Sequence, residues 1–159
     1  MPYLLEATHC LTEGMSKEQI DKVATDFGMP VGPIELADRV GLDICLSIAE
    51  HLKEFYGDEI PEQLKTMVEK DRLGVKMGEG FYRYANGKRV KSKTISDVKE
   101  APDLTDRLIL QLVNEVAKCL NEKIVKNEDL ADAGVIYGMG FSPFLGGRSV
   151  MQKVEEKRK

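Results

Sequence analysis

The chain carries two related copies of one helical segment. The stretch LLEATHCLTE at residues 4–13 returns as VNEVAKCLNE at residues 113–122, so that a glutamate, a cysteine and a second glutamate recur 109 positions later. The offset has grown to 112 at two later glycines, Gly28 and Gly140, which requires only small insertions. A repeat this long indicates a duplication rather than a solenoid. The two copies therefore predict a fold in which each buries the apolar face of the other.

Composition indicates an ordinary globular protein and argues against several classes. With 159 residues, 42% hydrophobic and 31% charged, the chain is long enough for one core or for two small helical units that share one. No run of about 18 apolar residues occurs, so we expect no transmembrane helix. The first residues lack the charged and apolar regions of a signal peptide. A net charge of −4 argues against nucleic acid as a partner, because affinity for phosphates requires concentrated Lys and Arg.

Neither the cysteines nor the histidines form a recognisable site. The three cysteines are an odd number without a C-x-x-C pair and lie in apolar helical contexts, which favours free thiols in a reducing compartment. The only histidines, His9 and His51, belong to no cluster with metal-ligand spacing, so we expect no metal site. No nucleophile or carboxylate is convincingly placed near His9, and His51 suits the dipole at a helix end. The sequence therefore predicts no catalytic residue.

Hydrophobic periodicity predicts an all-α fold that begins with two helices. Apolar residues follow one helical face from Leu4 to Gly14, and the pattern starts without an N-cap, as expected of a helix truncated at its beginning. A second helix begins at a capping box, in which Ser16 is followed three residues later by Gln19.

Two further helices are expected before the middle of the chain. Pro33 suits the first turn of a third helix that runs to about Leu52, and a fourth should follow Pro61. The third helix has an apolar residue at every fourth position, which predicts a buried stripe. The members of this stripe are Leu36, Val40, Ile44, Ile48 and Leu52.

A glycine-rich segment at residues 74–88 cannot form a regular helix. Alternating aromatic residues followed by Asn86-Gly87 predict a short extended piece that closes in a tight turn. Gly78 and Gly80 begin like a dinucleotide-binding fingerprint, but an arginine stands where the third glycine belongs and no strand–turn–helix pattern surrounds them. We therefore predict no cofactor-binding residue here.

The predicted organisation has three parts. Residues 1–87 form a first, N-terminally truncated helical repeat, residues 88–102 a polar and lysine-rich linker, and residues 103–159 a second, shorter repeat. The second repeat contains the clearest helix, followed by another that Asn127 can cap. The broad apolar stripe of the clear helix comprises Leu104, Leu108, Ile109, Leu112, Val113, Val116, Leu120 and Ile124.

Several motifs resemble the C-terminal domain of 3-hydroxyacyl-CoA dehydrogenases. FGMPVGPIELADRVGLD at residues 27–43 is similar to the family pattern G-x-P-x-G-P-x-E-L-x-D-x-x-G-L-D, and KMGEGFYRY at residues 76–84 to the closing pattern K-x-G-x-G-F-Y-x-Y. DAGVIYGMGF at residues 132–141, with Pro-Phe and Gly-Gly pairs after it, resembles the second copy of this domain in multifunctional fatty-acid β-oxidation proteins. The resemblance covers nearly the whole chain and implies two tandem all-α repeats packed as an internal pseudo-dimer.

The resemblance implies a part in the NAD-dependent oxidation of L-3-hydroxyacyl-CoA to 3-ketoacyl-CoA. In the family, an N-terminal Rossmann domain binds NAD and supplies a catalytic His–Glu dyad, and this sequence contains neither. The implied partners are that Rossmann domain and the acyl-CoA substrate, with NAD bound by the parent enzyme and no cofactor by this chain. The implied location is the cytoplasm of a bacterium or the mitochondrial matrix of a eukaryote.

The two repeats differ at a position that the family uses for substrate. The resemblance implies an Asn-Arg-x-Leu motif, whose asparagine assists substrate binding, just before the first residues of this chain. In the second repeat Asp106 occupies the matching place. This difference favours a structural role for the second repeat.

Residues around the first Gly/Pro turn are the candidates for lining the acyl end of the substrate: Met29, Pro30, Val31 and Leu36. A helical domain can supply an apolar wall that excludes water and holds the reacting groups in near-attack geometry when a cofactor domain closes over it. Alternatively, the turn only orients the third helix. For the whole chain, the alternative is a free-standing helical module for dimerisation or acyl-CoA binding.

Overall fold

Seven α-helices and one small hairpin make up the part of the chain that the computed structural model describes, residues 2–57, 59–90 and 102–140. In order, the elements are α1 (Pro2–Thr12), α2 (Lys17–Phe27), α3 (Pro33–Val40), α4 (Leu42–Tyr56), α5 (Glu62–Glu69), the 3₁₀ turn η1 (Val75–Met77), β1 (Tyr84–Ala85), β2 (Lys88–Arg89), α6 (Pro102–Asn121) and α7 (Glu128–Met139). The all-α prediction is confirmed. Most of the predicted linker and the end of the second repeat lie outside the described residues.

Helices α1 and α2 form where the sequence predicted them. The Ser16 hydroxyl accepts a hydrogen bond from the Gln19 backbone N–H at 3.1 Å, as the capping box requires. At the other end of α2, Gly28 adopts a φ of 116°, a left-handed conformation that glycine takes without steric cost. The turn that follows leads directly into α3, whose first residue is Pro33.

The predicted third helix over residues 33–52 is wrong as one element, because the chain breaks at Gly41. Gly41 has a φ of 106°, outside the helical region, and α4 restarts at Leu42 with its N–H donated to the Leu73 carbonyl at 3.2 Å. Because the helix restarts after this break, the side chains of Leu42 and Cys45 lie in the core.

As a result the predicted stripe is not buried. Val40, Ile44 and Ile48 are 40%, 46% and 41% exposed. Leu36 and Leu52 at its two ends are half-buried. An apolar face therefore runs over the end of α3 and along α4 without being covered by the described part of the chain.

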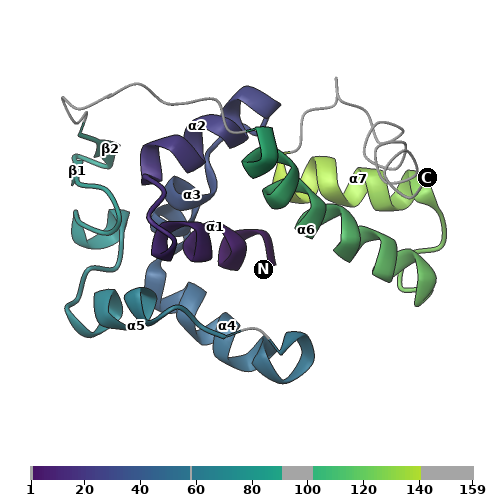
Figure 1. The fold of residues 1–159 in the computed structure, drawn as a ribbon, viewed down its shortest axis with the longest axis horizontal. Helices are drawn as coiled ribbons and strands as arrows, with labels where there is room; N and C mark the ends of the chain where they lie inside the picture. Colours follow the sequence, from purple (N-terminus) through teal and green to yellow (C-terminus); the bar gives the residue numbers. More distant parts are fainter. Residues whose placement is uncertain (1, 58, 91–101, 141–159) are drawn as a thin grey trace.

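One hydrophobic cluster joins the segments assigned to the two repeats. Helix α6 packs against α1 and α2, and Figure 1 shows it beside them, with α7 on its far side. The stripe of α6 is buried over its first half, whereas Val116 and Leu120 are half-buried and Ile124 lies beyond the end of the helix. The members of the cluster from α1, α2 and α6 are Tyr3, Ala7, Cys10, Ile20, Val23, Ala24, Leu104, Leu108, Ile109, Leu112 and Val113.

An ion-pair cluster reinforces this contact at its edge. The Arg107 guanidinium of α6 binds the carboxylates of Glu6 on α1 and of Glu13 directly after α1, with Nη1 and Nη2 at 2.5 and 2.7 Å from the two Glu13 oxygens. Two-point pairing of this kind fixes the orientation of the partners as well as attracting them.

The predicted extended piece is confirmed as a β-hairpin. Tyr84 pairs with Arg89 and Ala85 with Lys88, and Asn86-Gly87 forms the turn. The predicted end of the first repeat at residue 87 therefore falls inside the hairpin turn.

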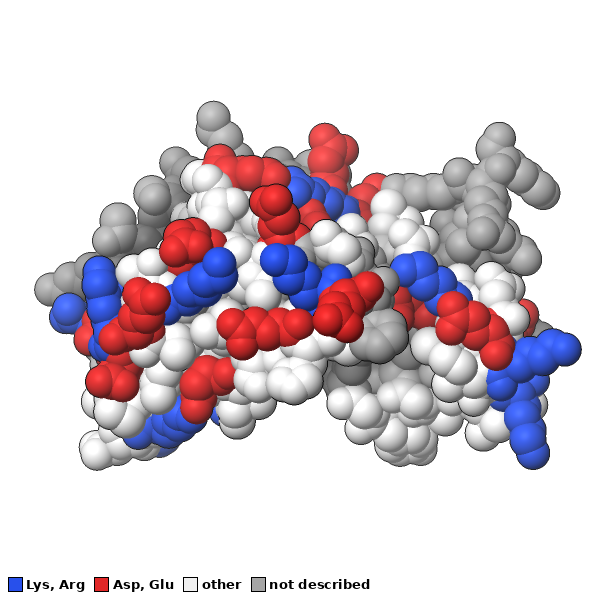
Figure 2. Space-filling view, turned by 90° about the horizontal axis from the view of Figure 1, so that it is seen from below, with Lys and Arg blue, Asp and Glu red and all other residues white. Residues whose placement is uncertain are grey.

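The surface carries charge of both signs. Figure 2 shows acidic and basic side chains interspersed over the face that it presents, without a large field of one sign. Within the described ranges, no helix has both the length and the apolar character needed to cross a bilayer.

Replacing Leu108 by alanine tests the shared core. Leu108 lies on α6 and is fully buried in the shared cluster. Leu108→Ala should therefore lower the free energy of unfolding by about 2–5 kcal/mol. Urea denaturation followed by circular dichroism should show a single transition for both proteins. Leu130→Ala on α7, where the side chain is 52% exposed, is the control and should change stability by less than about 0.5 kcal/mol. Two separate transitions in the unmodified chain would contradict a shared core.

Candidate functional site

The buried carboxylate of Asp38 on α3 organises the glycine-rich segment. It accepts hydrogen bonds from the backbone N–H groups of Phe81 and Tyr82, both at 2.8 Å, and from the Tyr84 hydroxyl at 3.0 Å. A Cβ at Gly80 would lie 2.0 Å from an Asp38 carboxylate oxygen, so only glycine fits there. The space beside Gly80 is thus filled by Asp38 and does not fit the pyrophosphate of a dinucleotide.

A second buried carboxylate, Asp21 on α2, caps α3. Gly32 at the N-cap of α3 has no side chain to offer, and Asp21 instead accepts hydrogen bonds from the N–H groups of Ile34 at 2.8 Å and Glu35 at 3.1 Å. The Tyr82 hydroxyl donates to the same carboxylate at 2.9 Å. Asp21 thereby ties α2, the start of α3 and the glycine-rich segment together.

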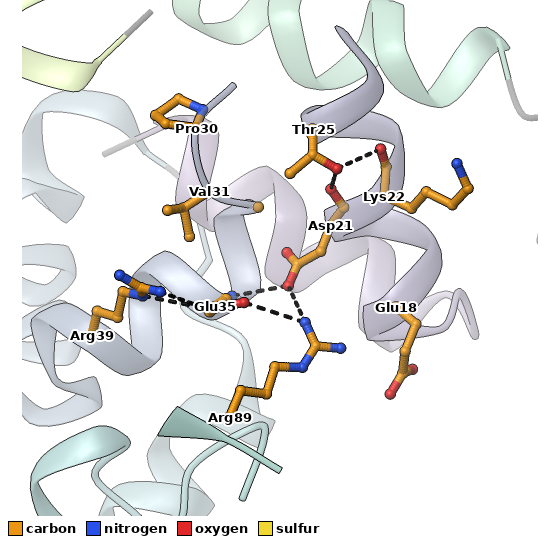
Figure 3. Close-up of a pocket in the computed structure, with 10 residues that line it drawn as sticks. Glu18, Asp21, Lys22, Thr25, Pro30, Val31, Glu35, Arg39 and Arg89 are labelled. Carbon is orange, nitrogen blue, oxygen red and sulfur yellow. Dashed lines mark hydrogen bonds and ion pairs between the residues drawn. The ribbon is translucent and has the colours of Figure 1, made fainter. Parts of the chain in front are cut away.

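A pocket of about 300 Å³ opens beside Asp21. Pro30 and Val31 form an apolar wall, and Glu35, Arg39 and Arg89 contribute charged groups (Figure 3). Glu35 binds both arginines, at 2.7 Å from Nη2 of Arg39 and 3.3 Å from Nη1 of Arg89. The remaining lining comes from Glu18, Asp21, Lys22, Thr25 and Gly32.

Burial and charge set the electrostatics of this corner. Burial raises the pKa of Asp21 to about 6, although the backbone donors, Tyr82 and Arg89 all favour the ionised carboxylate. Burial and the neighbouring Asp21 carboxylate raise the pKa of Tyr82, so that its hydroxyl stays a donor. The Arg89 guanidinium lies over the Tyr82 ring at 3.5 Å, an arrangement that holds the arginine at the mouth of the pocket.

The structure brings two of the four predicted substrate-lining residues together. Pro30, which is exposed, and Val31, which is half-buried, line the pocket. Met29 points into the core with 4% of its surface exposed, and Leu36 is half-buried on α3 outside the lining of this pocket. Contact of any of the four with an acyl chain stays a prediction.

The arrangement is better suited to binding than to nucleophilic catalysis. The described residues that line the pocket include no His, Cys or Ser side chain, and two of its three carboxylates, Asp21 and Glu35, hold structural hydrogen bonds, while the third belongs to Glu18. His9 faces a different groove, beside Glu50 and Lys53, and His51 donates from Nδ1 to the Ser47 carbonyl of its own helix. Within the described ranges, no group of His, Cys, Asp and Glu side chains is arranged to hold a metal ion.

Sequence reasoning missed the charged half of the pocket. Glu35 and Arg39 stand four residues apart on one helix, a spacing typical of an ion pair, so this signal was available. Asp21 sits next to the buried Ile20, and an aspartate on a buried helix face indicates a capping or site role. No local pattern could place Arg89, because it reaches Glu35 from 54 positions away in the chain.

Comparison with known proteins gives a consistent result. Residues 1–84 match the family model described as 3-hydroxyacyl-CoA dehydrogenase, C-terminal domain. The fatty acid oxidation complex subunit alpha of Idiomarina loihiensis is 40% identical over 160 residues, which cover 92% of this chain and 22% of the relative. The chain thus spans about a fifth of the length of the curated relatives it matches.

Two solved structures share the fold. The dehydrogenase part of multifunctional enzyme 1 from C. elegans is 26% identical, with a TM-score of 0.57, over 79% of this chain and 33% of that one. The 3-hydroxybutyryl-CoA dehydrogenase of Escherichia coli K12 has a TM-score of 0.68 at 18% identity, over 88% of this chain and 48% of that one.

A methyl group at Gly32 tests the cap formed by Asp21. The backbone of Gly32 has an ordinary φ of −67°, but a Cβ there would lie 2.3 Å from the Asp21 side chain. Gly32→Ala should therefore displace Asp21 and lower the free energy of unfolding by about 1–3 kcal/mol. Gly134→Ala in α7, where no other atom lies within 4 Å, is the matched control and should stabilise by about 0.5–1 kcal/mol. Equal effects of the two substitutions in thermal denaturation would refute the cap.

The raised pKa of Asp21 predicts a pH-dependent stability. Since this pKa is raised to about 6 by folding, the ionised carboxylate costs stability, and the contribution present below about pH 4 is lost as the pH rises through 6. Asp21→Asn mimics the protonated group at every pH. Between pH 4 and 7, the free energy of unfolding of the unmodified chain should fall relative to Asp21→Asn by roughly 2 kcal/mol. A difference that stays constant over this range in urea titrations would rule out titration of Asp21.

Proposed function

The chain belongs to the 3-hydroxyacyl-CoA dehydrogenase family through its C-terminal domain, and we propose that it is the substrate-side and assembly domain of an NAD-dependent L-3-hydroxyacyl-CoA dehydrogenase of fatty acid oxidation. The observation that carries this proposal is the apolar Pro30–Val31 wall, held rigid beside a pocket by the Asp21 cap. The described pocket offers binding surface without a His, Cys or Ser side chain, and the proposal assigns the chemistry to another domain.

The domain acts by positioning. Hydride transfer requires donor and acceptor carbons held in near-attack geometry with water excluded. Pro30 has a fixed φ, and the turn after it is anchored because Asp21 holds the first N–H groups of α3. Val31 presents an apolar surface for the acyl chain, while Arg39 and Arg89 offer donors to the polar atoms of a thioester.

The partner of this domain is the NAD-binding Rossmann domain of the parent protein. When bound there, NAD would supply the hydride acceptor for the 3-hydroxyacyl group. The described residues of this chain contribute no group to the cofactor site in this proposal. Its location follows that of the parent, the cytoplasm in a bacterium or the mitochondrial matrix in a eukaryote.

The two repeats form an internal pseudo-dimer. The α1–α6 contact supports this arrangement, since residues 4–13 and 113–122 are the related segments. The helices that follow them also match. Both α2 and α7 begin with a side-chain cap, from Ser16 and Asn127, and both end at a glycine in the left-handed region. Two extra residues before α7 and one within it account for the drift of the offset from 109 to 112.

A free-standing module for dimerisation or acyl-CoA binding is the second candidate. The exposed face of Val40, Ile44 and Ile48 favours it, because apolar side chains in a row at helical spacing are typical of a contact surface. This candidate predicts binding by the chain alone, whereas the first predicts that dehydrogenase activity depends on a second domain.

In this proposal, the purified chain alone should not oxidise NADH in the presence of acetoacetyl-CoA, because the NAD site belongs to the Rossmann domain of the parent protein. Loss of NADH absorbance is the measurement. Turnover by the chain itself would overturn the assignment of the chemistry to another domain.

A chimera tests the substrate-side role. Residues 1–159 replace the matching part of the Idiomarina loihiensis subunit, and the chimera should reduce acetoacetyl-CoA. Val31→Asp should raise its KM for acetoacetyl-CoA about tenfold, because a charge in the wall opposes the acyl chain, and should leave the KM for NADH unchanged. Tyr137→Ala, where the side chain is 89% exposed, is the control and should leave both values unchanged. An inactive chimera that folds, or no effect of Val31→Asp, would contradict the role.

A further inference from the structure

A second pocket, of about 350 Å³, is lined by residues of α1, α2 and α5 and of the segment that follows α5. It shares no lining residue with the pocket beside Asp21. Its volume falls in the range of roughly 300–1,000 Å³ that is typical of small-molecule sites. The pocket is therefore large enough for a small ligand rather than for a single ion.

Three cations line this pocket, and among its described lining residues there is no carboxylate. They are Lys17 at the first position of α2, Lys70 at the end of α5, and Arg72 in the following loop. The chain has a net charge of −4, but all the charged residues that line this pocket are positive. The pocket therefore differs in the sign of its charge from the protein as a whole.

Two of these cations are held in place by neutral backbone carbonyls. Lys17 Nζ donates to the Phe81 carbonyl at 2.6 Å, and Arg72 Nη2 donates to the Gly80 carbonyl at 2.8 Å. Arg72 also approaches Glu79 at 3.4 Å, outside the pocket lining. These contacts orient the two groups and consume only part of their donor capacity.

Further polar groups line the pocket. The Lys70 side chain is exposed at the rim, and Thr66 and Gln63 add polar groups on α5. Buried Met67 and Phe81 close the floor, and such an apolar floor strengthens charge-assisted bonds above it.

We propose that this pocket binds the phosphate group of a small phosphorylated molecule. Three cations in one lining match the nearly two negative charges and three acceptor oxygens of a phosphate monoester better than the single charge of a carboxylate. The volume in excess of a phosphate accommodates the group esterified to it. This inference does not depend on the function proposed above, because no residue is common to the two pockets.

Calorimetric titration of the 159-residue chain with inorganic phosphate at low salt tests the proposal. Binding should saturate, and Lys70→Ala should weaken it about tenfold by removing one charge-assisted contact. Lys65→Ala is the matched control, because Lys65 lies on the same helix, carries the same charge and lines a different groove. It should change the affinity by less than about twofold, as expected for screened surface charge.

A second variant and a second probe sharpen the result. Gln63→Glu places a carboxylate in the pocket at an exposed position and should abolish phosphate binding while the circular dichroism spectrum stays unchanged. Coenzyme A, titrated in parallel, distinguishes a phosphate ester from free phosphate. If coenzyme A binds more tightly than inorganic phosphate and this binding is lost in Gln63→Glu, the ligand is an ester. If only inorganic phosphate binds, the ligand is the free ion. No saturable binding of either probe, or equal losses in Lys70→Ala and Lys65→Ala, would overturn the proposal.

Discussion

The fold of residues 17–90 depends on two buried aspartates, Asp21 and Asp38, that satisfy backbone N–H groups in irregular segments. A helix start and a glycine-rich turn both leave N–H groups without partners, and in the interior such groups cost free energy. Asp38 accepts from Phe81 and Tyr82, and Asp21 accepts from the first turn of α3. Because each carboxylate comes from a different element than the groups it binds, the two interactions lock three elements into one unit.

The two aspartates also explain why the signature motifs are rich in glycine and tyrosine. Gly32 and Gly80 are the positions where the chain approaches each carboxylate too closely for a Cβ. Tyr82 and Tyr84 supply the third hydrogen bond to each carboxylate through their hydroxyl groups. The Gly/Pro turn and the closing aromatic segment, far apart in the sequence, are therefore two halves of one hydrogen-bond network, and the stiffness of the pocket beside Asp21 follows from it.

Features that depend on neighbouring residues could be predicted from the sequence, whereas contacts between residues far apart in the chain could not. The capping box at Ser16, the buried first half of α6 and the hairpin at Asn86-Gly87 depend on neighbouring residues, and sequence patterns report these directly. The break at Gly41 was missed because an apolar residue every fourth position outweighed a single glycine. Of the pocket, Pro30 and Val31 could be predicted, whereas the position of Arg89 depends on a hairpin that returns it to Glu35.

Helix α6 packs against α1 and α2 and completes the hydrophobic cluster that they share. A small domain of roughly 60 residues buries a smaller share of its surface than a large one and is only marginally stable. Tyr3, Ala7 and Cys10 of α1 belong to the hydrophobic cluster that α6 completes. In the proposed pseudo-dimer, a second copy on the same chain covers this face, so the contact is intramolecular and independent of protein concentration. Because α1 packs against α3 as well as α6, the contact with α6 helps to fix the position of the Asp21 cap and of the Pro30–Val31 wall. In the proposed function, α6 would thus contribute to substrate binding through rigidity.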